Sequence, residues 1–204
     1  MALNMLWYFQ NKILMITKYT SEIFDVLRKG QFICSNSPDD DIQKLYKVLE
    51  DDETFEDLHE YFYQINYILE QGNEYFYFSR IENSTDLDRK LEKAFNWIDI
   101  LDFFKTFDSS FDVGFRFSPS DIVNQLKNNA DLKTKLEKLK KIGVDKKSYS
   151  DRIKKIIEKL EKDNFITLEN EISETYKVLT SLNYLKDIIT AINIPEEIEN
   201  EIPE

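Results

Sequence analysis

The side chains that most often carry chemistry are scarce in this sequence. His59 is the only histidine, so a catalytic triad has one candidate base and no nucleophile to match it. Cys34 is the only cysteine, which excludes an internal disulfide and suits a reducing cytoplasm. The chain has no Gly-x-x-x-x-Gly-Lys phosphate loop, no Gly-x-Gly-x-x-Gly turn, no Cys-x-x-Cys pair and no His-Glu-x-x-His helix. We therefore expect no enzyme and no catalytic, cofactor-binding or metal-binding residues.

Three consecutive acids, Asp39 to Asp41, resemble the start of a calcium-binding loop. The glycine and the distal glutamate of that loop are missing. The acids follow Ser37 and Pro38, which are favoured at the cap and the first position of a helix, and the helix dipole favours negative charge there. We expect a helix start capped by Ser37, not a metal site.

Positive charge is concentrated between Lys127 and Lys162. This segment has 13 Lys or Arg against 6 Asp or Glu, in a chain whose net charge is −12. The whole molecule is therefore a poor non-specific DNA binder, but this segment could contact phosphates. An ordinary solvated helix face is the alternative. The candidate DNA-contact residues are Lys133, Lys140, Lys141, Lys146, Lys147, Arg152, Lys154 and Lys155.

A mainly helical fold must position these side chains, because the chain has only four glycines and four prolines and is rich in Leu, Ile, Lys and Glu. Tyr67 to Arg80 holds two β-prone runs, and we expect a β-hairpin in which Gly72 or Asn73 takes a positive φ. Helices are expected from Thr20 to Lys29, after Ser37 and after Thr54. The order helix, helix, hairpin is typical of a winged helix.

The same order returns further along the chain. A β-prone stretch from Phe111 to Phe117 precedes helices expected at Ser118, at Asp131 and at Ser148 or Ser150, and a second hairpin spans Phe165 to Leu179. We predict a mainly α fold with small β-hairpins (α+β), organised as tandem winged-helix domains. The expected parts are an apolar extension (1–18), a first winged helix (19–84), a linking helix (85–110), a second winged helix (111–194) and an acidic tail (195–204).

The linking helix is apolar on two faces from Phe95 onward, and a helix that is apolar nearly all round is buried on both sides. An internal spine between the domains and a dimer seam both explain this pattern. The candidate dimer or interdomain interface residues are Trp97, Ile100, Phe103 and Phe104.

The helix before the first hairpin has an acidic outer face, formed by Glu56, Asp57 and Glu60. No Lys or Arg occurs between Lys47 and Arg80. A helix that meets a phosphate backbone should not be so acidic. We therefore predict that the first winged helix binds protein.

The first residues carry an apolar run, Leu3 to Ile16, which is too short to span a bilayer. It lacks the features of a secretory signal. We expect either a buried helix or an upstream start codon, with Met15 as the natural first residue.

Several stretches resemble a known family: Phe24 to Ile33, Leu45-Tyr46, Glu74 to Arg80, Trp97 to Phe103, Phe165 to Glu169 and Tyr176 to Leu179. They are similar to the MukE/MksE-type subunits of bacterial condensins, which are tandem winged-helix "kite" proteins. The resemblance covers roughly residues 19–194.

The resemblance implies a non-catalytic, cytoplasmic, nucleoid-associated subunit that forms a homodimer and meets DNA within a complex, away from any membrane. Its partners would be a MukF/MksF-like kleisin and a MukB/MksB-like SMC-type ATPase, which would carry out the ATP chemistry. Such complexes segregate chromosomes or, in Wadjet-type systems, act against plasmids. Two other hypotheses stay open: a tandem winged-helix transcription or plasmid-replication factor, and a structural dimer with Phe95 to Phe104 as its seam.

Overall fold

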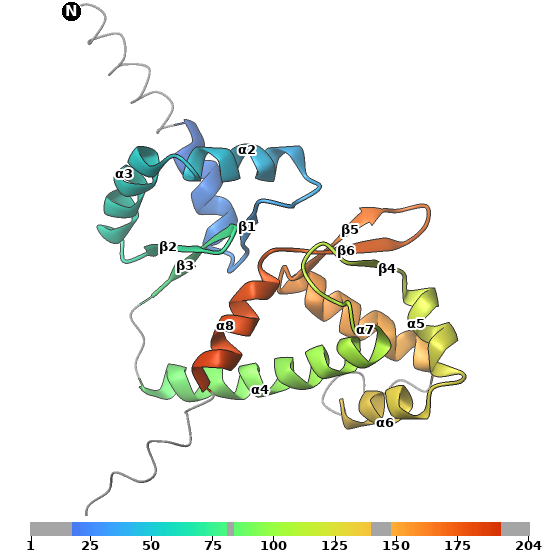
Figure 1. Cartoon of the computed structure of the whole chain (residues 1–204). Coiled ribbons are helices and arrows are strands. Elements are labelled where there is room, and N and C mark those ends of the chain that lie inside the picture. Colours follow the sequence, from blue (N-terminus) through green and yellow to red (C-terminus); the bar gives the residue numbers. More distant parts are fainter. Residues whose placement is uncertain (1–17, 81–83, 140–147, 193–204) are drawn as a thin grey trace, which may run out of the picture.

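The computed structural model describes residues 18–80, 84–139 and 148–192, and it places two groups of helices beside two small sheets (Figure 1). Residues 18–27 are helical, and the first half continues with β1 (Ile33–Cys34), α2 (Asp40–Leu49), α3 (Asp52–Tyr63), β2 (Ile68–Gly72) and β3 (Tyr75–Ser79). The second half comprises α4 (Ser84–Phe107), β4 (Arg116–Phe117), α5 (Pro119–Leu126), α6 (Ala130–Lys138), α7 (Tyr149–Lys162), β5 (Ile166–Asn170), β6 (Thr175–Val178) and α8 (Leu182–Ile192). The predicted class, mainly α with small β-hairpins, is confirmed.

Both halves contain a three-stranded antiparallel sheet with the same topology. The strand orders are β1-β3-β2 and β4-β6-β5, so in each half the early short strand pairs with the second strand of the hairpin. Both expected hairpins are present. In each half a helix directly precedes the hairpin, α3 in the first and α7 in the second. The two halves thus share their element order up to the hairpin, although the described part of the second half has two additional helices, α6 and α8.

The first hairpin turns at Asn73 and Glu74, since Gly72 and Tyr75 are cross-strand partners. The prediction that Gly72 or Asn73 would take the positive φ was wrong, because Glu74 does so (φ 65°). Gly72 is needed for another reason. A Cβ atom on Gly72 would lie 2.0 Å from Cζ of Tyr75, whose ring covers the glycine.

Two predicted helix caps were wrong by a few residues. The cap of α2 is Asp39, whose carboxylate accepts from the N–H groups of Asp41 and Ile42, and Ser37 only supports it by accepting from the Asp39 N–H. The cap of α3 is Asp51, which accepts from both the N–H and the hydroxyl of Thr54. A carboxylate at the positive end of the helix dipole is stabilised there, which favours these aspartates over the hydroxyl residues nearby.

Other predicted helix boundaries are confirmed. Gly30 has a positive φ (78°) after the first helix. Ser118 forms a reciprocal capping box with Asp121. Ser148, and not Ser150, caps α7. The predicted strand between Phe111 and Phe117 is reduced to Arg116–Phe117.

The first half is held together by a hydrophobic core that brings every described element into contact. Its fully buried side chains include Ile23, Leu58 and Phe62 from helices and Ile33 and Phe76 from strands. The rings of Phe62 and Phe78 meet edge-on at 4.9 Å. Each large apolar side chain buried in this way contributes about 1.5–3 kcal/mol to folding.

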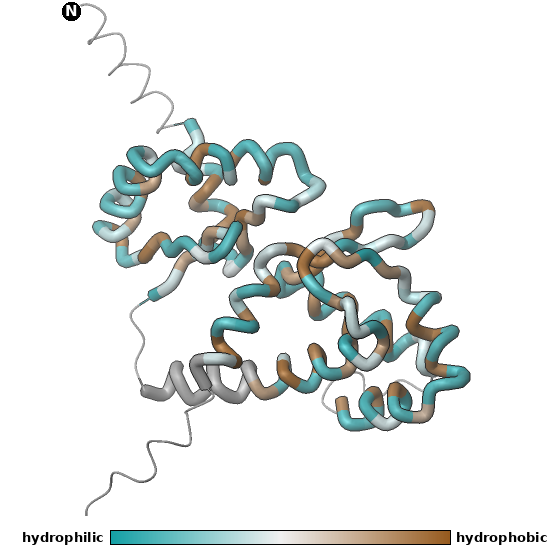
Figure 2. The backbone as a smooth tube through the Cα atoms, viewed as in Figure 1, coloured by the Kyte–Doolittle hydropathy of each residue, from teal (hydrophilic) through white to brown (hydrophobic). Residues whose placement is uncertain are grey.

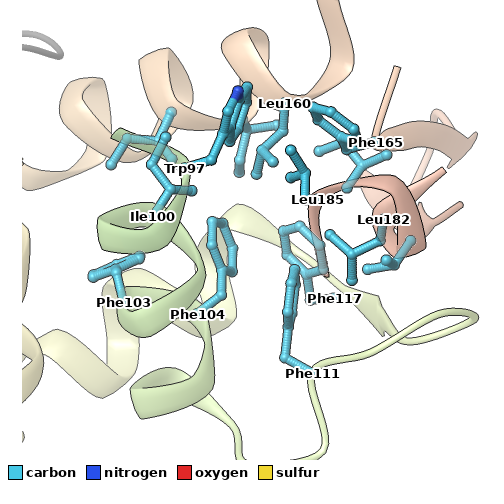
Figure 3. Close-up of a cluster of buried hydrophobic side chains, with 14 of the residues drawn as sticks. Trp97, Ile100, Phe103, Phe104, Phe111, Phe117, Leu160, Phe165, Leu182 and Leu185 are labelled. Carbon is cyan, nitrogen blue, oxygen red and sulfur yellow. The ribbon is translucent and has the colours of Figure 1, made fainter. Parts of the chain in front are cut away.

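The second core is larger and is built around the C-terminal half of α4 (Figure 3). Trp97, Ile100, Phe103 and Phe104 of α4 point into it and are 0–6% exposed. Their neighbours come from α5 to α8 and from the sheet, and α4 packs against both α6 and α8. The described part of α4 therefore contributes to the core of the second half.

Polar contacts join the two halves where β1 of the first half meets the end of β6. The side-chain amide of Asn36 donates to the carbonyl of Val178 (3.0 Å) and accepts from the N–H of Thr180 (3.0 Å), as a backbone peptide of an added strand would. The Thr180 hydroxyl donates to the carbonyl of Glu74 (2.7 Å). On the other side, the N–H of Phe32 donates to Oδ1 of Asn164 (2.8 Å).

Aromatic side chains fill the space between the halves. Phe32 lies 5.6 Å from Tyr75, 5.8 Å from Phe165 and 5.3 Å from Tyr184, measured between ring centroids. Tyr77 contacts Tyr184 at 5.0 Å, and burial raises the pKa of Tyr77 to about 12. Because these rings belong to both the sheet of the first half and α8 of the second, the joint buries apolar surface as well as satisfying polar groups.

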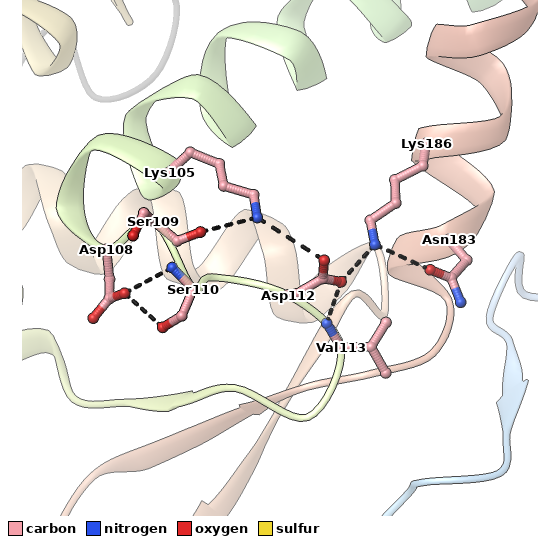
Figure 4. A network of polar contacts seen from close by, with 8 residues as sticks. All are labelled: Lys105, Asp108, Ser109, Ser110, Asp112, Val113, Asn183 and Lys186. Atoms are coloured by element: carbon pink, nitrogen blue, oxygen red, sulfur yellow. Dashed lines mark hydrogen bonds and ion pairs between the residues drawn. The ribbon is translucent and has the colours of Figure 1, made fainter.

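Asp112 connects the loop after α4 to α8 (Figure 4). Its carboxylate accepts from Nζ of Lys186 and from the N–H of Val113, and Nζ of Lys105 lies 3.9 Å away. Partial burial raises the pKa of Asp112, but the hydrogen bonds from Lys186 and Val113 and the charges of both lysines outweigh it. The pKa is therefore held below its ordinary value of 3.8.

Replacing Asp112 by asparagine should lower stability by less than about 1 kcal/mol, because the ion pairs are partly exposed. A lowered pKa in the folded state means that the carboxylate stabilises the protein above pH 3.8 and loses this effect as the pH falls through the folded-state pKa. Urea unfolding at several pH values should show a wild-type advantage at neutral pH that shrinks below pH 3.8. Asp99→Asn, on the exposed face of α4, is the control. A difference independent of pH would contradict this assignment.

Candidate functional site

The outer face of α3 is a negatively charged surface. Leu58 and Phe62 anchor the helix in the core, and the opposite side exposes Glu56, Asp57 and Glu60. The tube through α3 is largely hydrophilic in Figure 2. The sequence prediction of an acidic outward face therefore agrees with the placement of these side chains. Such a face repels phosphate and attracts cationic groups.

A row of aromatic rings borders this acidic face. Phe55, His59 and Tyr63 are spaced four residues apart along α3. The ring centroids of Phe55 and His59 are 6.1 Å apart, and those of His59 and Tyr63 are 6.5 Å apart, with the second pair stacked at 15°. Phe55 is anchored by Phe76 (5.8 Å), whereas Tyr63 is 58% exposed. This row is not among the surfaces predicted from the sequence. The sequence feature that could reveal the row is its spacing of four residues, but buried core positions of a helix have the same spacing.

The helix α7 occupies the matching place in the second half, directly before the hairpin, and unlike α3 it exposes lysines, with Asp151, Glu158 and Glu161 exposed beside them. Four buried side chains, Ile153, Ile156, Ile157 and Leu160, fix one face of the helix against the core. Lys154 and Lys155 are exposed on the other face. Lys155 pairs with Glu158 on the surface, and such a pair is weak enough to yield to a phosphate.

The other predicted DNA-contact residues do not share this placement. Arg152 donates to the carbonyl of Leu136 and so links α7 to α6. Lys133 is half-buried and donates to the carbonyl of Lys127 (3.3 Å). The remaining four, Lys140, Lys141, Lys146 and Lys147, lie outside the described residues, as do the predicted extension up to residue 17 and the predicted acidic tail.

The predicted dimer or interdomain interface residues are buried within a single chain. Trp97 meets Phe165 edge-on at 4.9 Å, and Phe104 stacks on Phe111 at 4.6 Å. At 0–6% exposure the four side chains of α4 offer almost no surface to a second chain in this conformation. A homodimer stays a prediction, and its seam would need other residues.

Within the residues that the structure describes, no group of three or more His, Cys, Asp or Glu side chains could hold a metal ion. Nor is any helix of that part of the chain long and apolar enough to cross a membrane. Cys34 is buried at the joint between the halves, and burial raises the pKa of its thiol although Thr180 and Ser181 lower it by hydrogen bonding. A buried thiol of this kind is unreactive.

Comparisons with known proteins show the family of this chain. Neither the curated proteins nor the solved structures contain a match to the chain. A family model described as condensin complex protein MksE matches residues 18–189. This range includes every described strand and every described helix except the end of α8. The chain therefore belongs to the MksE family of condensin complex proteins.

Proposed function

We propose that this protein is a non-catalytic accessory subunit of a bacterial SMC-like condensin complex, in which each half acts as a winged helix. The repeated topology and the family membership support this proposal. The observation that carries it is the contrast between α3 and α7, which hold the same place before their hairpins. The charged side chains that α3 exposes are all acidic, whereas α7 also exposes lysines. One scaffold thus presents one surface suited to protein and one suited to DNA.

The first half binds the kleisin subunit of the complex. An acidic helix in the position where DNA-binding winged helices read the major groove is unsuited to phosphate. An exposed aromatic residue next to it, Tyr63 (58%), is of a type enriched in protein interfaces. Binding at this face leaves α7 of the same chain free.

The second half contacts DNA that the assembled complex already holds. The net charge of −12 opposes binding by the isolated chain, whereas a partner that keeps DNA near α7 raises the local concentration of phosphate. The protein then serves chromosome segregation or plasmid defence in the cytoplasm, as a homodimer, and leaves ATP hydrolysis to the SMC-type subunit.

Co-purification of the tagged chain with its native partners tests the proposal. We expect a kleisin and a large coiled-coil ATPase, identified by mass spectrometry, and both should persist after nuclease treatment. Recovery of DNA alone, with sequence-selective binding by the purified chain, would instead support a transcription or plasmid-replication factor. The exposed lysines of α7 are the observation that favours this second candidate.

Neutralising Lys154 and Lys155 should weaken DNA capture by the reconstituted complex. Each lost phosphate contact reduces the magnitude of the negative slope of log K against log salt concentration by about 1. The variant Lys154→Gln with Lys155→Gln should therefore reduce this magnitude by about 2. Lys44→Gln with Lys47→Gln on α2, which removes the same charge from the first half, should leave the slope unchanged. Reversal of Lys140, Lys141, Lys154 and Lys155 to Glu should weaken capture further. An unchanged slope in the α7 variant would exclude phosphate contact there.

A further inference from the structure

We infer that the α3 surface, formed by the rings of Phe55, His59 and Tyr63 and the carboxylates of Glu56 and Glu60, binds an arginine-bearing segment of a partner protein. This inference rests on the proposed docking role of the first half. It adds the chemistry of the ligand and the residues that select it.

The rings form a continuous platform along the helix. Phe55 to His59 and His59 to Tyr63 are one helical turn apart. The planes of the first pair are tilted by 32°, and those of the second pair are nearly parallel at 15°. The platform is fixed at one end, because Phe55 packs on Phe76 (5.8 Å), and open at the other, where Tyr63 is 58% exposed. A planar cation can therefore stack on it without rearrangement of the core.

Carboxylates follow the platform on its outer side. Glu56 and Glu60 each come one residue after a ring, which places them about 100° further around the helix and one turn from each other. Both are exposed, and the sequence has no Lys or Arg between Lys47 and Arg80. Their spacing of four residues lets each face a different cation on a bound segment, or both face one.

Arginine is the side chain that uses both features together. Its planar guanidinium stacks on an aromatic face and at the same time donates two parallel hydrogen bonds to a carboxylate. A lysine ammonium is a compact, strongly hydrated charge that forms neither the parallel stack nor the bidentate pair. Nucleic acid and anionic lipid are repelled by the same carboxylates. The surface therefore favours a protein segment with arginine over these alternatives.

Two fluorescein-labelled peptides of equal length and charge, one with four arginines and one with four lysines, provide the probe. Anisotropy titrations near physiological salt, where long-range attraction to the acidic chain is screened, should show about fivefold or greater preference for the arginine peptide. Glu56→Gln with Glu60→Gln should weaken arginine-peptide binding about tenfold. Glu171→Gln with Glu174→Gln removes the same charge from the exposed tip of the second hairpin and should change it less than about twofold.

Substitution of a single ring separates stacking from charge. Tyr63→Ala should abolish most of the arginine preference while leaving lysine-peptide binding within about twofold of the wild type. Tyr61→Ala is the matched control, since Tyr61 is similarly exposed (52%) on the same helix but outside the row. Circular dichroism and thermal melting of all variants verify that α3 stays folded. Equal affinity for the two peptides, or equal effects of Tyr61→Ala and Tyr63→Ala, would overturn the inference.

The same variants, tested with the co-expressed kleisin and ATPase, separate this inference from the proposed function. We expect the Glu56/Glu60 and Tyr63 variants to lose kleisin affinity and the two controls to keep it. Full kleisin binding by the α3 variants would overturn this surface and leave the subunit role standing. A wild-type chain that prefers arginine through Tyr63 but recruits no condensin subunit would keep the surface and overturn the proposed function.

Discussion

Replacing Phe104 by alanine is expected to lower the free energy of unfolding by about 3–5 kcal/mol, because the substitution leaves a cavity that the surrounding side chains cannot close in to fill. Phe104 is 1% exposed, and its ring stacks on Phe111 at 4.6 Å and touches Phe103 (5.3 Å) and Phe117 (5.4 Å). The substitution would remove contacts to Phe103 on α4, to Phe111 in the loop that follows and to Phe117 on β4. Since small domains are stable by about 5–15 kcal/mol, this loss should be visible in urea unfolding as a large shift of the midpoint.

Phe95→Ala is the control for this prediction. Phe95 is on the same helix but 58% exposed, so its loss should change stability by no more than about 0.5 kcal/mol. Size-exclusion chromatography with light scattering shows whether either substitution alters the oligomeric state. If Phe104→Ala dissociated a dimer while the monomer kept its full stability, the face would be an intermolecular seam and the intramolecular packing described above would not hold in solution.

Replacing Gly72 by alanine is expected to destabilise the protein by about 3 kcal/mol, opposite in sign to the small gain that alanine usually brings over glycine in a strand. The new methyl group would lie 2.0 Å from Cζ of Tyr75, so the ring must leave its place. That ring contacts Phe32 (5.6 Å), and its hydroxyl donates to Asp187 of α8 (3.3 Å). The damage should therefore spread from the hairpin to the joint between the halves.

A double-mutant cycle with Tyr75→Ala identifies the cause. Once the ring is absent, Gly72→Ala meets no obstacle and should cost less than about 0.5 kcal/mol, which gives a coupling energy of about 2–3 kcal/mol. Calorimetric unfolding should also become broader in Gly72→Ala, because the two halves would lose part of the contact that makes them unfold together. Additive effects of the two substitutions would show that the clash is relieved elsewhere.

Local patterns in the sequence identified most of the elements and the charge of their outer faces. The hairpin from Tyr67 to Arg80 and the long helix α4 were predicted from aromatic and β-branched runs and from apolar periodicity. Cap positions were less accurate because neighbouring polar residues compete for the same N–H groups, and Asp39 and Asp51 prevailed over Ser37 and Thr54. The acidic face of α3 could be predicted because residues on a solvated face need only their own helix to place them.

What the sequence by itself determined is therefore the set of elements, the repeated order of helices and hairpins, and the contrast between an acidic helix in the first half and a lysine-rich segment in the second. Only the tertiary structure decided how the halves join. The contacts at the joint link Asn36 to Thr180 and Phe32 to Asn164, and the residues of each pair are more than 130 positions apart, so no periodic pattern in the sequence predicts them. It also decided that the apolar face of α4 is buried within one chain. Periodicity shows that a face must be covered, but only packing in three dimensions determines what covers it.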